Sequence, residues 1–92
     1  MSSSDPDKDP VLRDFREQIA ATDIELVAAV NKRVELVRRL KEHKAANGLD
    51  FVDRAQEERL VDRLAEANQG PLSEDGLRAL YQAVLELVKR ET

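Results

Sequence analysis

The feature that most constrains the fold is a long stretch, from Val11 to Ala46, that contains neither glycine nor proline. Its apolar residues recur at three-, four- and seven-residue steps, which is the spacing of one face of an α-helix. Those residues are Leu12, Phe15, Ile19, Leu26, Val30, Val37 and Leu40. Asn47 and Gly48 follow as a helix stop. We therefore expect one helix of roughly 50 Å, at ~1.5 Å per residue.

A helix of this length is too long for one small domain to cover. A 100-residue domain has a radius of gyration near 13 Å, which implies a breadth of roughly 26 Å. This chain has 92 residues, so about half of it remains to pack against the long helix. A second copy of the chain is the natural cover for the rest of the apolar face. The sequence therefore predicts an intertwined homodimer.

A short second helix is predicted after the Asn47-Gly48 stop. Asp53 is positioned as its N-cap, and Gln56, three residues later, completes the pattern of a capping box. An apolar stripe made by Leu60, Val61 and Leu64 follows, and the helix is expected to end near residues 68–70.

A medium third helix follows, with Ser73 as its N-cap and Leu72 packing onto Leu77 across the first turn. The expected fold class is therefore all-α, with one long, one short and one medium helix per chain. We expect residues 1–9, rich in serine, aspartate and proline, to form a flexible tail. Residues 10–92 then form a single helical domain.

Composition excludes several classes of function. The formal net charge of -4 and an aromatic content of 3% argue against a nucleic-acid surface. The chain has one histidine and no cysteine, which leaves little for a metal site or a nucleophilic triad. No apolar run approaches the ~20 residues that span a bilayer. We expect a soluble, cytoplasmic protein that binds neither nucleic acid nor membrane.

Two cations lie where the long helix should be apolar. Arg33 is three residues from Val30 and four from Val37, and Lys44 follows Arg33 by eleven residues, or about three turns. Cations on a buried face are costly unless they meet anions. Arg16 is about 100° round the helix from Arg33, so one helix cannot easily direct both at one small ligand, whereas two neighbouring chains can.

A pair of carboxylates accompanies these cations. Asp53 and Glu57 are four residues apart and therefore share a helical face. Cations can hold the carboxylates of a ligand, and a protein carboxylate can accept a hydrogen bond from a ligand hydroxyl. The pattern therefore indicates a site for a small anion that also carries a hydroxyl group.

Each of these residues also has a purely structural interpretation. Arg33 can extend to solvent from an interface or pair with a buried glutamate. Lys44 is favoured near a helix C-terminus by the helix dipole. Asp53 can be a plain N-cap and Glu57 a solvated surface residue. Periodicity alone leaves these alternatives open.

The ordered set of residues resembles the AroQ class of chorismate mutases, the all-helical type II family, over about residues 11–92. The family opens its long helix with an arginine that reaches the neighbouring active site of the dimer. Here that motif matches Phe15-Arg16-Glu17-Gln18-Ile19 followed by Asp23. The mid-helix arginine that clamps a substrate carboxylate matches Arg33 in Arg33-Val34-Glu35-Leu36, and the lysine that reaches the ether oxygen matches Lys44. The aspartate that begins helix two matches Asp53, and the glutamate that binds the substrate hydroxyl matches Glu57.

The chain departs from the family pattern at three positions. Family members commonly carry arginine just before the glutamate, where this chain has Gln56. Many carry glutamine or glutamate in the third helix beside the ether oxygen, where this chain has Thr92 on an expected fraying end. A serine often found upstream is Val88 here. The resemblance thus implies a catalytic set of Arg16, Arg33, Lys44 and Glu57. It implies that Asp53, Gln56, Val88 and Thr92 also line the substrate site.

The resemblance implies rearrangement of chorismate to prephenate in the biosynthesis of phenylalanine and tyrosine, without metal or cofactor. Some stand-alone members are weak alone and are activated by a DAHP synthase, so such a partner is expected here too. Two alternatives remain. An isochorismate-pyruvate lyase shares the fold and the basic clamp but tends to lack the Asp/Glu pair. A non-catalytic helical dimerisation or regulatory module would pair Arg33 and Lys44 with acidic residues at an interface.

Overall fold

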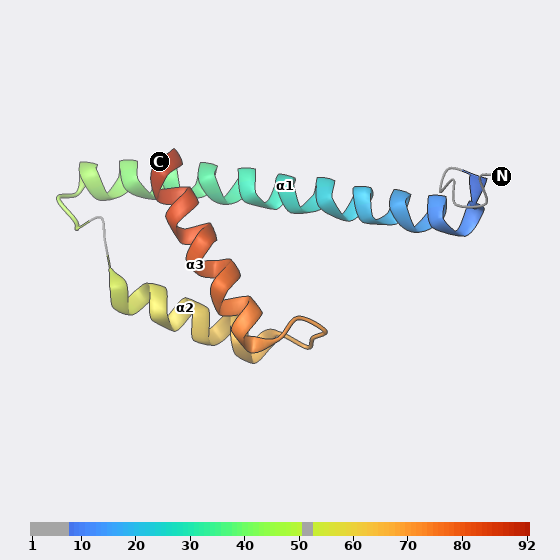
Figure 1. Cartoon of the computed structure of the whole chain (residues 1–92). Coiled ribbons are helices and arrows are strands. Elements are labelled where there is room, and N and C mark those ends of the chain that lie inside the picture. Colours follow the sequence, from blue (N-terminus) through green and yellow to red (C-terminus); the bar gives the residue numbers. More distant parts are fainter. Residues whose placement is uncertain (1–7, 51–52) are drawn as a thin grey trace. The chain divides into compact units, whose positions relative to one another are not determined.

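The computed structural model describes residues 8–50 and 53–92, and these ranges contain three α-helices and no strand (Figure 1). Helix α1 spans Pro10–Ala46, α2 spans Arg54–Ala67 and α3 spans Glu74–Glu91. The order of one long, one short and one medium helix confirms the prediction from sequence. Most of the expected tail, residues 1–7, lies outside the described residues.

The ends of the helices follow from local chemistry. Asp9 caps α1, since its Oδ1 accepts hydrogen bonds from the amides of Val11 and Leu12 at 2.9 and 3.2 Å. Pro10 suits the first helical position because the amide hydrogen it lacks has no partner there. Beyond Ala46, Gly48 has a φ of 66°, the left-handed backbone that glycine adopts without strain. The predicted stop at Asn47-Gly48 is confirmed.

The two shorter helices begin at the predicted caps. Asp53 Oδ1 accepts from the amide of Gln56 at 3.1 Å, and Ser73 Oγ accepts from the amide of Gly76 at 3.0 Å. Leu72 covers the first turn of α3, because its Cδ1 would lie 2.9 Å from a Cβ added to Gly76. A turn with Gly70 at a φ of 75° joins the two helices.

The chain divides into two units, residues 1–33 and 34–92, and the division falls within α1. The described part of the first unit is the N-terminal portion of α1 and the two residues before it, and its large apolar side chains are exposed except for Val30, which is half-buried. Ile19 is 59% exposed, Ile24 71% and Leu26 55%. Exposed apolar surface gathered on one helix is typical of a surface that binds a partner.

The second unit contains the end of α1 together with α2 and α3. The chain turns back after α2, so that α3 packs alongside it as a helical hairpin (Figure 1). Arg38 near the end of α1 donates to the carbonyl oxygen of Glu91 from Nε at 3.3 Å and from Nη2 at 3.0 Å. Among the described residues only Leu77 and Val88 are buried, and both belong to α3. Within residues 8–50 and 53–92, no helix combines the length and the apolar character needed to cross a bilayer.

Candidate active site

The predicted site residues divide between the two units. Arg16 and Arg33 belong to the first unit. The second unit contains Lys44, Asp53, Gln56, Glu57, Val88 and Thr92. The hairpin of α2 and α3 therefore brings the acidic and C-terminal members of the set into one unit with Lys44.

The two cations predicted on the apolar face of α1 are both half-buried. Arg33 and Lys44 differ in this from exposed neighbours such as Lys32 and Arg39. Among the residues that the structure describes, no carboxylate lies within ion-pair distance of either Arg33 or Lys44. A bound anion would stabilise a partly desolvated cation that has no counter-ion. Arg16 is exposed on the N-terminal portion of α1.

Asp53 and Gln56 have defined local roles. Asp53 Oδ1 accepts a hydrogen bond from the backbone amide of Gln56. The side-chain Oε1 of Gln56 accepts a hydrogen bond from Arg59 Nη2 at 2.8 Å. A capping box also requires the Gln56 side chain to accept from the backbone amide of Asp53. That part of the prediction was wrong, because the Gln56 side chain lies along its own helix and accepts from Arg59. Asp53 is exposed and keeps its second carboxylate oxygen for other hydrogen bonds.

Glu57 has a partner that no pattern in the sequence predicts. Its Oε1 lies 2.9 Å from Lys89 Nζ, and its Oε2 accepts from the same nitrogen at 3.3 Å. The side chain of Glu57 is 30% exposed and that of Lys89 50%. The two residues are 32 positions apart and on different helices. No local spacing could have indicated the pair, which depends on the way α2 and α3 pack.

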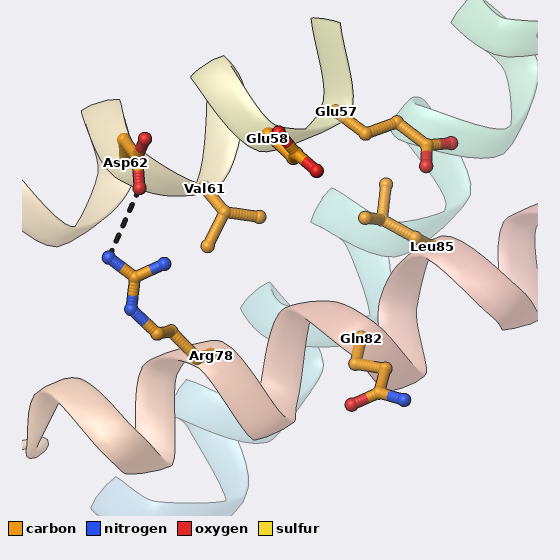
Figure 2. Close-up of a pocket in the computed structure, with 7 residues that line it drawn as sticks. All are labelled: Glu57, Glu58, Val61, Asp62, Arg78, Gln82 and Leu85. Carbon is orange, nitrogen blue, oxygen red and sulfur yellow. Dashed lines mark hydrogen bonds and ion pairs between the residues drawn. The ribbon is translucent and has the colours of Figure 1, made fainter. Parts of the chain in front are cut away.

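A groove of about 390 Å³ runs between α2 and α3 (Figure 2). Figure 2 shows Asp62 and Arg78 joined at one end, and Glu57 and Leu85 lying toward the other. The remaining lining residues are Glu58, Val61 and Gln82. Three of its side chains are carboxylates, and only Arg78, 3.1 Å from Asp62, is cationic. This charge balance opposes a dianion, so the groove by itself does not suit a ligand of the predicted kind.

The C-terminal end of α3, which was expected to fray, makes two contacts with side chains. Thr92 Oγ1 donates to the carbonyl oxygen of Val88 at 2.7 Å, and Arg38 binds the carbonyl oxygen of Glu91. The proton of the Thr92 hydroxyl is therefore used within the helix. Val88 is 2% exposed, and its side chain contributes to packing.

Comparison with known families matches residues 15–92 to chorismate mutase type II. The match covers most of the chain, and the chain therefore belongs to this family. Members are isomerases that act on chorismate, which agrees with the all-helical fold and with Arg33 and Lys44, for which no carboxylate partner lies among the described residues. Comparisons with curated proteins and with solved structures find no match.

The N-cap role of Asp53 and its predicted role toward the substrate can be separated by substitution. Asparagine is as good an N-cap as aspartate, so Asp53→Asn should leave the free energy of unfolding unchanged, whereas Asp53→Ala should lower it by about 1 kcal/mol. We expect Asp53→Asn nevertheless to lower mutase turnover by about tenfold, because a neutral amide oxygen accepts a substrate hydroxyl less strongly than a carboxylate. Urea denaturation and chorismate consumption measure the two effects. Unchanged turnover in Asp53→Asn would leave the residue as a cap alone.

Proposed function

We propose that the chain converts chorismate to prephenate in the biosynthesis of phenylalanine and tyrosine, at active sites that two chains of a homodimer share. The observation that carries the proposal is the pair of half-buried cations, Arg33 and Lys44, which have no carboxylate partner among the described residues. Family membership over residues 15–92 supplies the reaction. The composition, without cysteine, is compatible with the reducing cytoplasm, where we place this activity.

The reaction is a pericyclic rearrangement, and it needs neither a nucleophile nor a general acid. Catalysis rests on holding the dianion in its compact reactive geometry and on stabilising charge that develops at the ether oxygen. Arg33 and Arg16 of the neighbouring chain are assigned to the substrate carboxylates. Lys44 is assigned to the ether oxygen, where its charge acts more strongly if water is excluded.

The opposite side of the site is assigned to the hydroxyl of the substrate. Asp53 and Glu57 are the acceptors, and Gln56, Val88 and Thr92 complete the lining. The hydroxyl of Thr92 already donates to Val88, so it is a poor second donor to the ether oxygen. One missing transition-state donor can cost on the order of 10²–10³ in rate. We therefore expect a real but modest mutase.

Exposed apolar surface on α1 supports the homodimer. Phe15 is 57% exposed, Leu26 55% and Leu40 49%. These side chains recur along one helix of 37 residues, of which none is buried in the single chain. A second copy that packs its own α1 against these positions would remove this surface from water, at roughly 25 cal/mol per Å². An isologous interface of this kind also brings Arg16 of one chain to the site of the other.

Turnover tests the proposed reaction directly. Purified protein should consume chorismate and release prephenate, and Arg33→Ala and Lys44→Ala should each reduce the rate by on the order of 10²–10³. The matched controls are Arg39→Ala and Lys32→Ala, which remove exposed cations from the same helix. Release of salicylate with pyruvate would instead identify the lyase. A folded dimer without turnover, alone or with a partner enzyme, would favour the non-catalytic module.

Complementation tests the shared site. Arg16→Ala and Lys44→Ala should each be nearly inactive alone. When the two variants are unfolded and refolded together, half of the dimers should be mixed, and each mixed dimer should contain one intact site. Turnover should then recover to about a quarter of the wild-type value. Refolding either variant with itself is the control. If Arg16 acts within its own chain, the mixture will stay inactive.

A DAHP synthase is the proposed activating partner, because the donor beside the ether oxygen is weak in this chain. Titration of the mutase with the cognate synthase should raise turnover, as the docked partner reorganises the α3 end that Arg38 and Thr92 now hold. Addition of an unrelated protein of similar charge is the control. A titration that leaves both kcat and KM unchanged would contradict activation by this partner.

A further inference from the structure

The ion pair between Glu57 and Lys89 has no counterpart in the predicted site. Both carboxylate oxygens of Glu57 lie near the Lys89 ammonium, at 2.9 and 3.3 Å. Lys89 belongs to the last turns of α3, and Leu85, one turn earlier on the same face, lines the groove beside Glu57 (Figure 2). The Lys89 ammonium therefore contacts Glu57 at the Leu85 end of the groove, away from the Asp62–Arg78 pair.

The backbone that carries Lys89 is held on both sides. Val88, the preceding residue, is 2% exposed, which fixes the rotation of α3 at this turn. Arg38 binds the carbonyl oxygen of Glu91, and Thr92 donates to the carbonyl oxygen of Val88. Lys89 thus extends from a fixed position, and its contact with Glu57 is set by the packing of α3.

The charge of Glu57 needs a counter-ion if a dianion is to bind beside it. A bare carboxylate would repel the two carboxylates of the substrate, more strongly as water leaves the site. Gln56 is neutral and accepts from Arg59 through its side chain, so it supplies no charge to Glu57. Glu58, the residue after Glu57, is acidic and lines the same groove. Among the described residues, Lys89 is the cation within ion-pair distance of Glu57.

We propose that Lys89 is a positioning residue that neutralises and orients Glu57, so that this carboxylate accepts the substrate hydroxyl without repelling the substrate dianion. Lys89 thereby supplies from α3 the positive charge that position 56 of α2 lacks. This inference rests on the proposed function, because it takes Glu57 as the hydroxyl acceptor. It assigns Lys89 no contact with the reacting atoms.

A double-mutant cycle on the full-length chain tests the inference. Lys89→Met should raise KM by about tenfold, the scale of one charge-assisted hydrogen bond, with kcat changed by less than about threefold. Lys89→Arg should restore most of the affinity because it restores the charge. In a Glu57→Gln background, Lys89→Met should change KM by less than about twofold. Arg90→Met is the control, since it removes an exposed cation from the adjacent position of α3.

Chorismate binding, measured by calorimetry, and circular dichroism accompany the kinetics. Lys89→Gln serves as a second variant and should show a similar loss of affinity with an unchanged helical spectrum. An unchanged KM in both variants would show that the ion pair only joins α2 to α3, and it would overturn the inference. Turnover by the wild-type chain would in that case still support the proposed function. An equal loss in the Glu57→Gln background would show that Lys89 acts on the substrate itself and would also overturn it. A wild-type chain that neither binds nor converts chorismate would overturn both proposals.

Discussion

Covering the apolar stripe of α1 is the energetic requirement on which the other features of this protein depend. The helix has 37 residues and none of them is buried in the single chain. A chain of 92 residues in which only Leu77 and Val88 are buried, among those described, has a small core of its own. Small domains commonly make up this deficit by association. The proposed homodimer meets the requirement, and the same association would let each chain contribute an arginine to its neighbour.

The α2–α3 hairpin meets a different requirement, which is to fix the position of charged groups. Ion pairs join its two helices near each end, Asp62 to Arg78 and Glu57 to Lys89. These side chains are between 30% and 64% exposed, and exposed pairs contribute only about 0–1 kcal/mol to stability. Their consequence lies in the orientation of the carboxylates. Glu57 is held at the groove end, where the proposed substrate hydroxyl would need an acceptor.

The distribution of charge also explains how a chain with a net charge of -4 can bind an anionic substrate. The half-buried cations Arg33 and Lys44 have no carboxylate partner in the part of the chain that the structure describes. Three acidic side chains line the groove instead, and Arg78 and Lys89 pair with two of them. Local unpaired charge, rather than the overall sign, decides which ligand a site of this size accepts.

Much of the fold was predictable from the sequence because helix signals are local. The caps at Asp53 and Ser73 and the stop at Gly48 each depend on a few adjacent residues, and all three are confirmed. The spacing of Arg33 and Lys44 likewise predicted two cations on the apolar face of α1, and both are half-buried. The roles of these residues toward substrate remain predictions, because no pattern within the chain measures them.

Tertiary structure decided which distant groups meet. The Glu57–Lys89 pair, the hold of Arg38 on the carbonyl oxygen of Glu91 and the use of the Thr92 hydroxyl by Val88 were not predicted. The first two join residues 32 and 53 positions apart, and the third depends on a helix end that was expected to fray. The sequence by itself determined where α1 ends and where α2 and α3 begin, since capping and backbone conformation act over a single turn. Only packing set the rotation of α3 against its neighbours, because that rotation depends on side chains from separate helices filling the same space.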